Sequence, residues 1–362
     1  MNRVFLNKAK RVVSRKAESM VGRLYPIQRT LTAMALRPFE LHLELTNLCN
    51  ADCVFCPYQF QTRAIEFMTD DVFRKAVSDF ISIGGGSIGL TPIVGDALID
   101  PKFLERVRYL RAQPTIDRIF LTTNAILLDK HGIDEVLNSG LTSVTISTAG
   151  FDRAMYERIY RSQSYERMRN NVLELVQKNA EHGSPIYITI GLRPDRPLAE
   201  VMKDQDFQPL LKYEPALDFT WSYTSASGRI TRELLPSVMK LRVVKSRKET
   251  CVQLYNDPIV LPDGTVMACS CVASMDAIAD LGVGNLMDTP LLEIWTSNQM
   301  RMLRSSFKNG SLNATCSSCD MYRDPDLYRR SEGRKRAEIN RMRNDGLAIR
   351  RSDEPRGPFS GG

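Results

Sequence analysis

The sequence predicts an α/β fold, a partial (β/α)6 TIM-like barrel followed by a small cysteine-rich domain. Two observations predict it. Between residues 39 and 240, stretches that alternate apolar and polar residues are separated by stretches whose apolar residues have helical spacing, which indicates parallel strands joined by helices. Over 241–325 the chain changes to short segments broken by Pro and Gly, and five of the eight cysteines lie there.

Strands and helices are predicted in strict alternation along the first domain. The first strand covers 39–46 and ends at a cysteine loop, and the helix over 69–83 begins at Thr69 with two aspartates in its first turn. The further strands are 87–91, 118–122, 143–147, 185–192 and one near 218–223, and the further helices are 101–112, 130–139 and 165–181. The carboxyl ends of barrel strands carry the chemistry, so functional side chains are expected there.

The two ends of the chain hold most of the net charge of +7. Residues 1–38 carry nine basic side chains and one acid, interleaved with apolar residues, which predicts a basic amphipathic helix that packs on the barrel or contacts a membrane surface. The segment 326–362 predicts a charged helix that fades into a disordered tail. No apolar stretch approaches the ~20 residues that span a bilayer, and no signal peptide is apparent, so a cytoplasmic protein is expected.

The first cysteine group is Cys49-Asn-Ala-Asp-Cys53-Val-Phe-Cys56, three thiols on one loop after a strand. Three thiolates hold three corners of an iron–sulfur cubane and leave the fourth iron open to a ligand. A zinc site would need a fourth Cys or His, and the nearest histidine, His42, lies within the preceding strand. The C-x3-C-x2-C spacing, with Phe55 before the third cysteine, resembles the signature of the radical S-adenosylmethionine (radical SAM) superfamily.

The resemblance covers roughly residues 39–322 and implies a [4Fe–4S] cluster that binds SAM through its amino and carboxylate groups. One electron, supplied by a flavodoxin- or ferredoxin-type donor, would cleave SAM to methionine and a 5′-deoxyadenosyl radical. Gly95 and Asp96 lie where the family usually has Gly-Gly-Glu-Pro for the SAM ammonium group, with Val94 and Asp96 in place of Gly and Glu.

Further cofactor contacts are implied by the same resemblance. Ser147 would contact the SAM ribose, and Asn124 would lie beside the SAM or substrate pocket. Arg193 would bind the SAM carboxylate, a role that suits its planar, two-pronged guanidinium. With Phe55 these complete the predicted cofactor-binding set, and the sequence identifies no catalytic acid or base.

The second cysteine group comprises Cys251, Cys269, Cys316 and Cys319, enough ligands for a closed [4Fe–4S] cluster or a zinc ribbon. The hairpin Gly264-x-Val266-x-x-Cys269, the Gly-Asn-Leu turn at 284–286, Ile-Trp at 294–295 and the closing C-x2-C resemble the auxiliary-cluster domain called SPASM. No cysteine follows Cys319, and in this respect the sequence resembles the shortened, one-cluster form of the domain, called twitch. Cys271, two residues after Cys269, is predicted to be a spectator; the alternatives are a ligand in place of Cys269 and a thiol near the substrate.

The arrangement resembles 2-deoxy-scyllo-inosamine dehydrogenase and implies radical oxidation (dehydrogenation) of a small alcohol, sugar or cyclitol, with the auxiliary cluster as electron acceptor. A peptide-modifying enzyme that forms crosslinks or epimerises residues is the alternative within the family. A zinc-ribbon nucleic-acid-binding protein is the alternative from another class. The basic residues are not interleaved with exposed aromatics or tied to a reading motif, so no nucleic-acid partner is expected.

Overall fold

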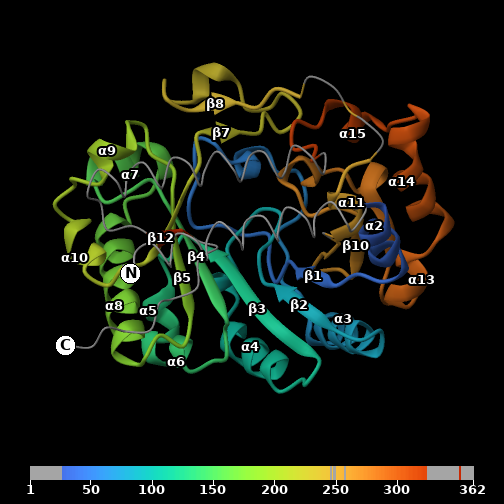
Figure 1. Ribbon diagram of the computed structural model, residues 1–362, viewed down its shortest axis with the longest axis horizontal. Coiled ribbons are helices and arrows are strands. Elements are labelled where there is room, and N and C mark those ends of the chain that lie inside the picture. Colours follow the sequence, from blue (N-terminus) through green and yellow to red (C-terminus); the bar gives the residue numbers. More distant parts are fainter. Residues whose placement is uncertain (1–26, 245–246, 248–249, 257, 324–349, 352–362) are drawn as a thin grey trace, which may run out of the picture.

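The computed structural model describes residues 27–244, 247, 250–256, 258–323 and 350–351. Six parallel strands follow one another in space in the order of the sequence, as predicted (Figure 1). They are β1 (Glu40–Leu43), β2 (Gly86–Gly89), β3 (Ile116–Thr123), β4 (Ser143–Thr148), β5 (Tyr187–Leu192) and β6 (Ala216–Phe219). Each pairs with the next in parallel, which confirms the α/β fold.

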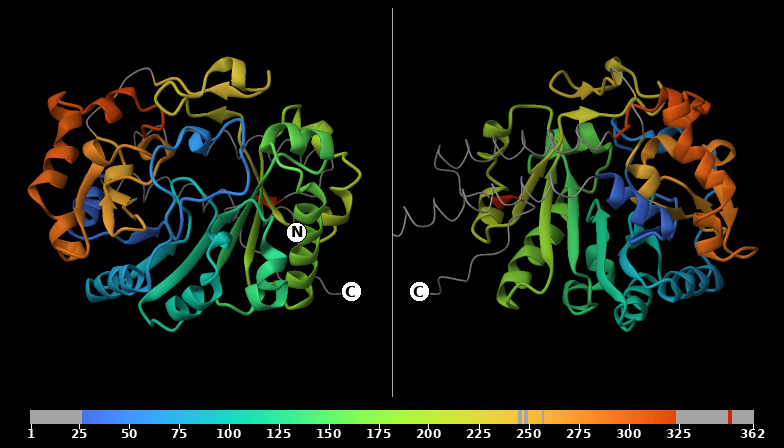
Figure 2. Two further views of the ribbon diagram at one scale, coloured as in Figure 1. Left: turned by 180° about the vertical axis from the view of Figure 1, so that it is seen from behind. Right: turned by 45° about the vertical axis from the view of Figure 1, so that its right-hand side comes forward.

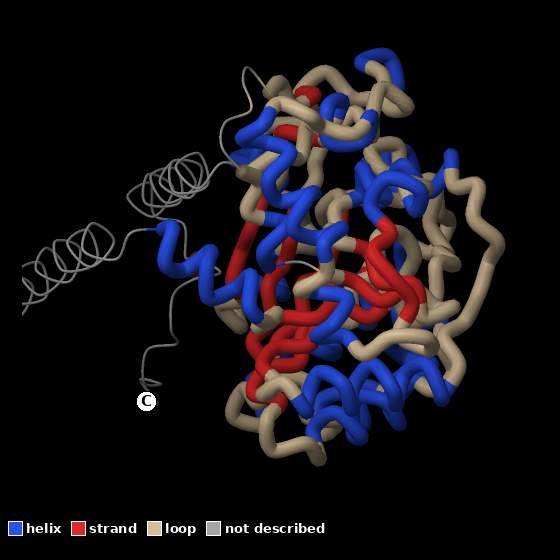
Figure 3. Tube along the Cα trace, turned by 90° about the vertical axis from the view of Figure 1, so that its right-hand side faces the viewer, coloured by secondary structure: helices blue, strands red, loops and turns tan. Residues whose placement is uncertain are grey.

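The helices that join these strands pack on the outside of the curved sheet (Figure 3). They include α3 (Asp70–Ser82), α4 (Phe103–Arg111) and α8 (Tyr165–Glu181), close to the predicted bounds. The predicted start of α3 is confirmed, because the Thr69 side chain accepts a hydrogen bond from the Val72 N–H and caps the helix. The buried face of α3 consists of Val72, Phe73, Ala76, Val77 and Phe80.

Some predicted elements differ in the structure. The helix expected over 130–139 is two short helices, α5 (Leu128–His131) and α6 (Ile133–Leu137), because Gly132 between them has a φ of 77°. The strand expected near 218–223 divides into β6 and β7 (Ser222–Tyr223), and β7 pairs with β8 (Lys240–Leu241) in a separate sheet.

Several short elements between the strands were not predicted. Helix α7 (Arg153–Tyr160) begins at Asp152, whose side chain accepts a hydrogen bond from the Met155 N–H. The others are α9 (Leu198–Val201), α10 (Gln208–Leu211), η1 (Pro57–Phe60), η2 (Ala97–Ile99) and η3 (Arg232–Leu234).

The cysteine-rich segment continues the barrel sheet. Strand β9 (Ile259–Val260) pairs with β1 in parallel, and β10 (Thr265–Met267) pairs antiparallel with β9 and with β11 (Gly282–Asn285). The surrounding helices are η4 (Val272–Ser274), α11 (Gln253–Asn256), α12 (Ile278–Leu281), α13 (Leu291–Trp295), α14 (Asn298–Asn309) and α15 (Ala314–Ser318). The barrel and the cysteine-rich segment therefore contribute strands to one sheet (Figure 2).

Two described pieces come from the predicted terminal segments. Helix α2 (Ile27–Leu36) is the described part of the helix predicted over 1–38, and its Met34 carbonyl accepts a 2.8 Å hydrogen bond from the Trp295 indole of α13. Strand β12 (Arg350–Arg351) lies parallel to β6, where a disordered tail was predicted. Residues 1–26 and the rest of 326–362 lie outside the described residues. Among those that are described, no helix has the length and apolar character needed to cross a membrane.

Candidate metal centres and cofactor site

The first cysteine loop follows β1 and rests on the carboxyl end of α7. The Asp52 N–H donates to the Tyr160 carbonyl at 3.1 Å, and the Val54 N–H donates to the Ile159 carbonyl at 2.9 Å. The last carbonyls of a helix lack partners within the helix, so the loop satisfies acceptors that would otherwise need water. Helix α7, which the sequence did not predict, is thus one support of the loop that carries Cys49, Cys53 and Cys56.

The segment after β2 supports the same loop from the other side. The Asp96 N–H donates to the Leu48 carbonyl at 2.9 Å. Gly95 has a φ of 115°, and a Cβ there would lie 2.8 Å from the Thr46 carbonyl oxygen. A side chain at position 95 would therefore push the cysteine loop away, which explains why glycine stands there.

The Asp96 carboxylate joins the ends of β2 and β3. It is 2% exposed and accepts hydrogen bonds from the Thr123 hydroxyl and the Asn124 N–H, each at 2.8 Å, and from the Leu98 N–H at 3.0 Å. Burial raises the pKa of this carboxyl, while the three donors oppose that effect. These contacts give Asp96 a structural role, and its contact with SAM stays a prediction.

Three other predicted residues come together at the cysteine loop. The Asn124 amide donates to the Asn50 side chain at 2.6 Å and lies 3.9 Å from the Cys49 sulfur. The Arg193 guanidinium lies 5.5 Å from the centre of the Phe55 ring, and its positive charge opposes the rise in the pKa of the neighbouring Cys53 thiol. The residues that follow β3 and β5 thus share one end of the barrel with the loop after β1.

Tyrosines that sequence reasoning missed line the same region. The Tyr160 hydroxyl lies 2.7 Å from the hydroxyl of Ser147, the predicted ribose contact. The Phe55 ring packs against Tyr160 and Tyr223, with ring centres 5.7 and 5.1 Å apart. Tyr160 belongs to α7, which was not predicted, and Tyr223 lies at the end of the strand predicted near 218–223; no sequence signal assigned either residue to the site.

The chemistry of the first thiol group fits an iron–sulfur cluster. Burial raises the pKa of Cys49 to about 12 and that of Cys56 to about 11, so these thiols become thiolates readily only where a cation compensates their charge. Within the part of the chain that the structure describes, no three His, Cys, Asp or Glu side chains are arranged to hold a single metal ion. Thiolates of a cubane bind different irons and stand further apart than ligands of one ion.

The second thiol group surrounds one cavity beside β10, α12 and α15. Five cysteines line it, namely Cys251, Cys269, Cys271, Cys316 and Cys319. The Cys269 and Cys271 sulfurs are 3.2 Å apart, and contact with Cys271 is the largest influence that raises the pKa of Cys319. The fifth thiol, predicted to be a spectator, therefore lies among the four predicted ligands.

The hairpin that leads to Cys269 has the geometry that its sequence predicts. Gly264 has a φ of 88°, and a Cβ there would lie 2.8 Å from the Asn285 side-chain oxygen. Asn285 in turn donates to the Asp263 carbonyl at 3.1 Å and holds the turn against β11. The Gly and Asn of the two matched motifs thus contact one another.

Sequence comparison matches two families along the chain. Residues 43–207 match the radical SAM superfamily, and residues 251–320 match SPASM, an iron–sulfur cluster-binding domain. Among curated proteins, GTP 3′,8-cyclase of Pasteurella multocida is 29% identical over 137 residues, which are 37% of this chain and 40% of that protein. The enzyme of Chlorobaculum tepidum is 28% identical over 131 residues, 35% and 38% of the two chains. The matched regions span less than half the length of these relatives.

Solved structures share the fold of both parts. BtrN in complex with AdoMet and 2-DOIA has a TM-score of 0.52 at 13% identity, covering 78% of this chain and 93% of that one. Streptococcus suis SuiB bound to the precursor peptide SuiA has a TM-score of 0.57 at 13% identity, covering 81% and 72%. The chain therefore carries a radical SAM domain and a C-terminal SPASM domain, which imply SAM, a [4Fe–4S] cluster and auxiliary iron–sulfur clusters as its cofactors.

Proposed function

We propose that this radical SAM enzyme is an oxidoreductase that dehydrogenates a small alcohol, sugar or cyclitol. The observation that carries the proposal is the position of the second thiol group, which is anchored beside the end of the barrel where the first one lies. Asp320, next to Cys319, accepts hydrogen bonds from the Thr224 hydroxyl and the Ser225 N–H. Asp276, which follows η4, accepts a 3.2 Å hydrogen bond from the Thr62 N–H in the loop after Cys56.

The inner face of the barrel suits a substrate rich in hydroxyl groups. Along β4, the half-buried residues Ser143, Thr145 and Ser147 alternate with fully buried ones, as expected when one face of the strand points to the outer helices. On β3, Thr122 is also half-buried. Hydroxyl side chains both donate and accept hydrogen bonds, and therefore match the alcohol groups of a sugar or cyclitol.

The proposed net reaction converts a secondary alcohol to a ketone. When bound at Cys49, Cys53 and Cys56, the cluster and SAM supply a radical that takes one hydrogen atom from carbon. The hydroxyl proton would then leave to solvent or a base, and a cluster held by the second thiol group would accept the remaining electron. The tyrosines and Phe55 keep water from the first centre, and Arg193 and Asn124 orient the bound cofactor.

A deuterium-transfer assay tests the proposal. Anaerobically reconstituted enzyme is given SAM, a reduced flavodoxin or ferredoxin, and a panel of sugars and cyclitols deuterated at the carbinol carbons. We expect deuterium in 5′-deoxyadenosine together with one equivalent of ketone, and neither product with Cys49→Ala. Deuterium transfer from a peptide, with a crosslinked or epimerised product and no ketone from any alcohol, would instead support the peptide-modifying alternative.

A further inference from the structure

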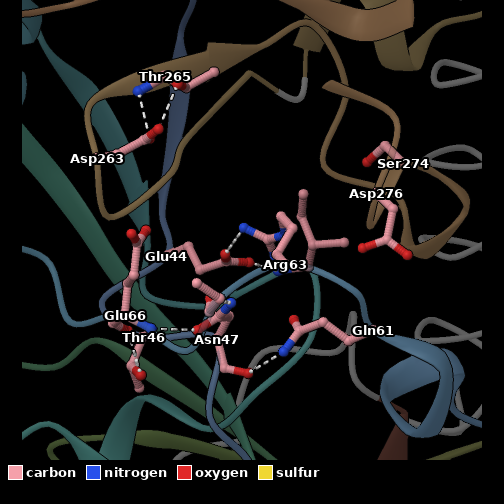
Figure 4. A network of polar contacts seen from close by, with 12 residues as sticks. Glu44, Thr46, Asn47, Gln61, Arg63, Glu66, Asp263, Thr265, Ser274 and Asp276 are labelled. Carbon is pink, nitrogen blue, oxygen red and sulfur yellow. Dashed lines mark hydrogen bonds and ion pairs between the residues drawn. The ribbon is translucent and has the colours of Figure 1, made fainter. Parts of the chain in front are cut away.

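The segment that follows the first cysteine loop runs back along the end of β1. The Asn47 side chain accepts a 2.9 Å hydrogen bond from the Glu66 N–H and donates a 2.7 Å bond to the Ala64 carbonyl. The Thr46 hydroxyl donates to the Glu66 carbonyl at 2.8 Å. This double attachment, drawn in Figure 4, fixes residues 61–66 at the mouth of the barrel.

Arg63 in this segment reaches the carboxylate of Glu44 at the end of β1 (Figure 4). The Arg63 Nη1 atom lies 2.6 Å from Glu44 Oε1, and the two side chains are 11% and 0% exposed. The other carboxylate oxygen, Oε2, accepts a 2.9 Å hydrogen bond from the Ile93 N–H in the loop after β2. Glu44 is thus held from two sides and fixes the position of the guanidinium.

The hydrogen-bonding capacity of Arg63 is not used up by this pair. Its Nε and Nη2 atoms are buried, and among the described residues they meet no hydrogen-bond acceptor. Gln61 Oε1, two residues earlier, is likewise buried without a donor in the described part of the chain. A buried donor without an acceptor is costly, so two such donors on one guanidinium need a ligand or ordered water to satisfy them.

The segment around Arg63 lies between the two thiol groups. On one side the Gln61 amide donates to the Asn47 carbonyl, two residues before Cys49, at 3.4 Å. On the other side the Thr62 N–H donates to Asp276, a few residues after Cys271, at 3.2 Å. The second Asp276 oxygen pairs with Arg229 at 2.8 Å, so that carboxylate already has its own cation.

We propose that Arg63 binds an anionic group of the substrate, a phosphate or a carboxylate, with Glu44 as the positioning residue. A planar guanidinium with two donors on one edge matches two oxygens of such a group. The inference deepens the proposed function and rests on it for the identity of the bound molecule. The alcohol that is oxidised would carry a phosphate or a carboxylate. The carboxylate of SAM has the same chemistry and is the competing source.

Phosphate binding tests the assignment without turnover. The reconstituted holoenzyme is titrated anaerobically with inorganic phosphate by calorimetry, at an ionic strength held constant with chloride. We expect Arg63→Gln to weaken phosphate binding at least tenfold and Arg63→Lys at least threefold, because lysine keeps the charge and loses the two-pronged geometry. Arg229→Gln, which removes the same charge from the same rim, should stay within twofold of wild type.

A variant of Glu44 tests the positioning role. In Glu44→Gln the amide oxygen can still accept from the Ile93 N–H, but the amide NH2 group then faces Arg63 Nη1, donor against donor. The guanidinium keeps its charge and loses the partner that holds it, so phosphate should bind more weakly than to wild type. This arm keeps the test decisive if Arg63→Gln does not fold. Equal affinity in wild type and both Arg63 variants, or unchanged binding by Glu44→Gln, would overturn the proposal.

Saturating SAM separates the two sources of the anion. If phosphate occupies a substrate subsite, its affinity should change less than twofold when SAM is present. Loss of the Arg63-dependent binding in the presence of SAM would assign the guanidinium to the SAM carboxylate and overturn the substrate assignment. The titration involves no reductant and no turnover. Phosphate binding at Arg63 can therefore be measured even if the enzyme does not dehydrogenate an alcohol.

Discussion

Each of the three thiols on the loop after β1 is expected to be indispensable. A cluster held by three protein ligands cannot spare one, so Cys49→Ala, Cys53→Ala or Cys56→Ala should abolish 5′-deoxyadenosine formation. Iron should fall from about eight to about four per chain, since the second site keeps its own ligands. Iron and sulfide analysis after anaerobic reconstitution measures this. A variant that still cleaves SAM with dithionite would contradict the assignment.

Cys271 leads to a prediction at the second site. Its sulfur lies 3.2 Å from that of Cys269 and lines the same cavity, so either thiol can reach one corner of a cluster. We therefore expect Cys269→Ser and Cys271→Ser each to retain most of the iron, and the double variant to lose about four irons per chain. Cys316 has no second thiol on its helix, so Cys316→Ser is the matched control. This single substitution should by itself remove about four irons per chain. Full loss with Cys269→Ser would show Cys271 to be a spectator.

Residues of the site differ in how far the sequence alone can predict them. The cysteines were predicted because their spacing is local. Asn124 and Arg193 were predicted because the family resemblance could be carried over to the ends of predicted strands. Arg63 and Tyr160 were not, since their partners Glu44 and Ser147 are 19 and 13 positions away and meet them only through the fold.

At the scale of elements, Asp96 links two strand ends, and its loss should destabilise the fold. Asp96→Ala leaves the Thr123 hydroxyl and the Leu98 and Asn124 N–H groups without their acceptor, at a cost of about 3 kcal/mol or more. Asp96→Asn keeps one oxygen and should lose less. Chemical denaturation of both variants measures the difference. A loss below about 1 kcal/mol in Asp96→Ala would show that water replaces the carboxylate.

Element boundaries were predicted well where the signal is local, and poorly where it is not. Thr69 and the two aspartates after it mark the start of α3, and the structure confirms this cap. Gly132 ends α5 with a positive φ, although the apolar spacing on both sides reads as one helix. The eight-residue helix α7 was missed between two strands, and it turned out to support the cysteine loop.

For the whole molecule, the boundary near residue 240 separates two sequence patterns, but it does not separate two sheets. The parallel pairing of β9 with β1 places the cysteine-rich domain on the edge of the barrel, and the His42 N–H donates to the Pro258 carbonyl at 2.9 Å. No local pattern predicts this pairing, because its partners are more than 200 positions apart. It explains how the second thiol group comes to lie near the barrel mouth.

Helix α2 provides a test of how the terminal helix is integrated. Trp295 is fully buried and donates to the Met34 carbonyl, and Arg304, stacked 4.3 Å from the Trp295 ring, donates to the Ala35 carbonyl at 3.4 Å. A chain that starts at Arg37 loses both acceptors and uncovers the indole. We expect it to unfold at a clearly lower temperature and to retain less iron at the second site, because α13 and α14 lose their cover.

The matched control is a chain that starts at Ile27, which keeps α2 and every contact described for it. It should unfold within error of the full chain and cleave SAM equally well. Trp295→Phe, which removes only the indole donor, should cost about 1 kcal/mol and lie between the two. Thermal unfolding followed by circular dichroism, with iron analysis of each sample, makes the comparison. If the chain starting at Arg37 matched the one starting at Ile27 in both measurements, α2 would be an accessory helix on the surface and not part of the folded unit.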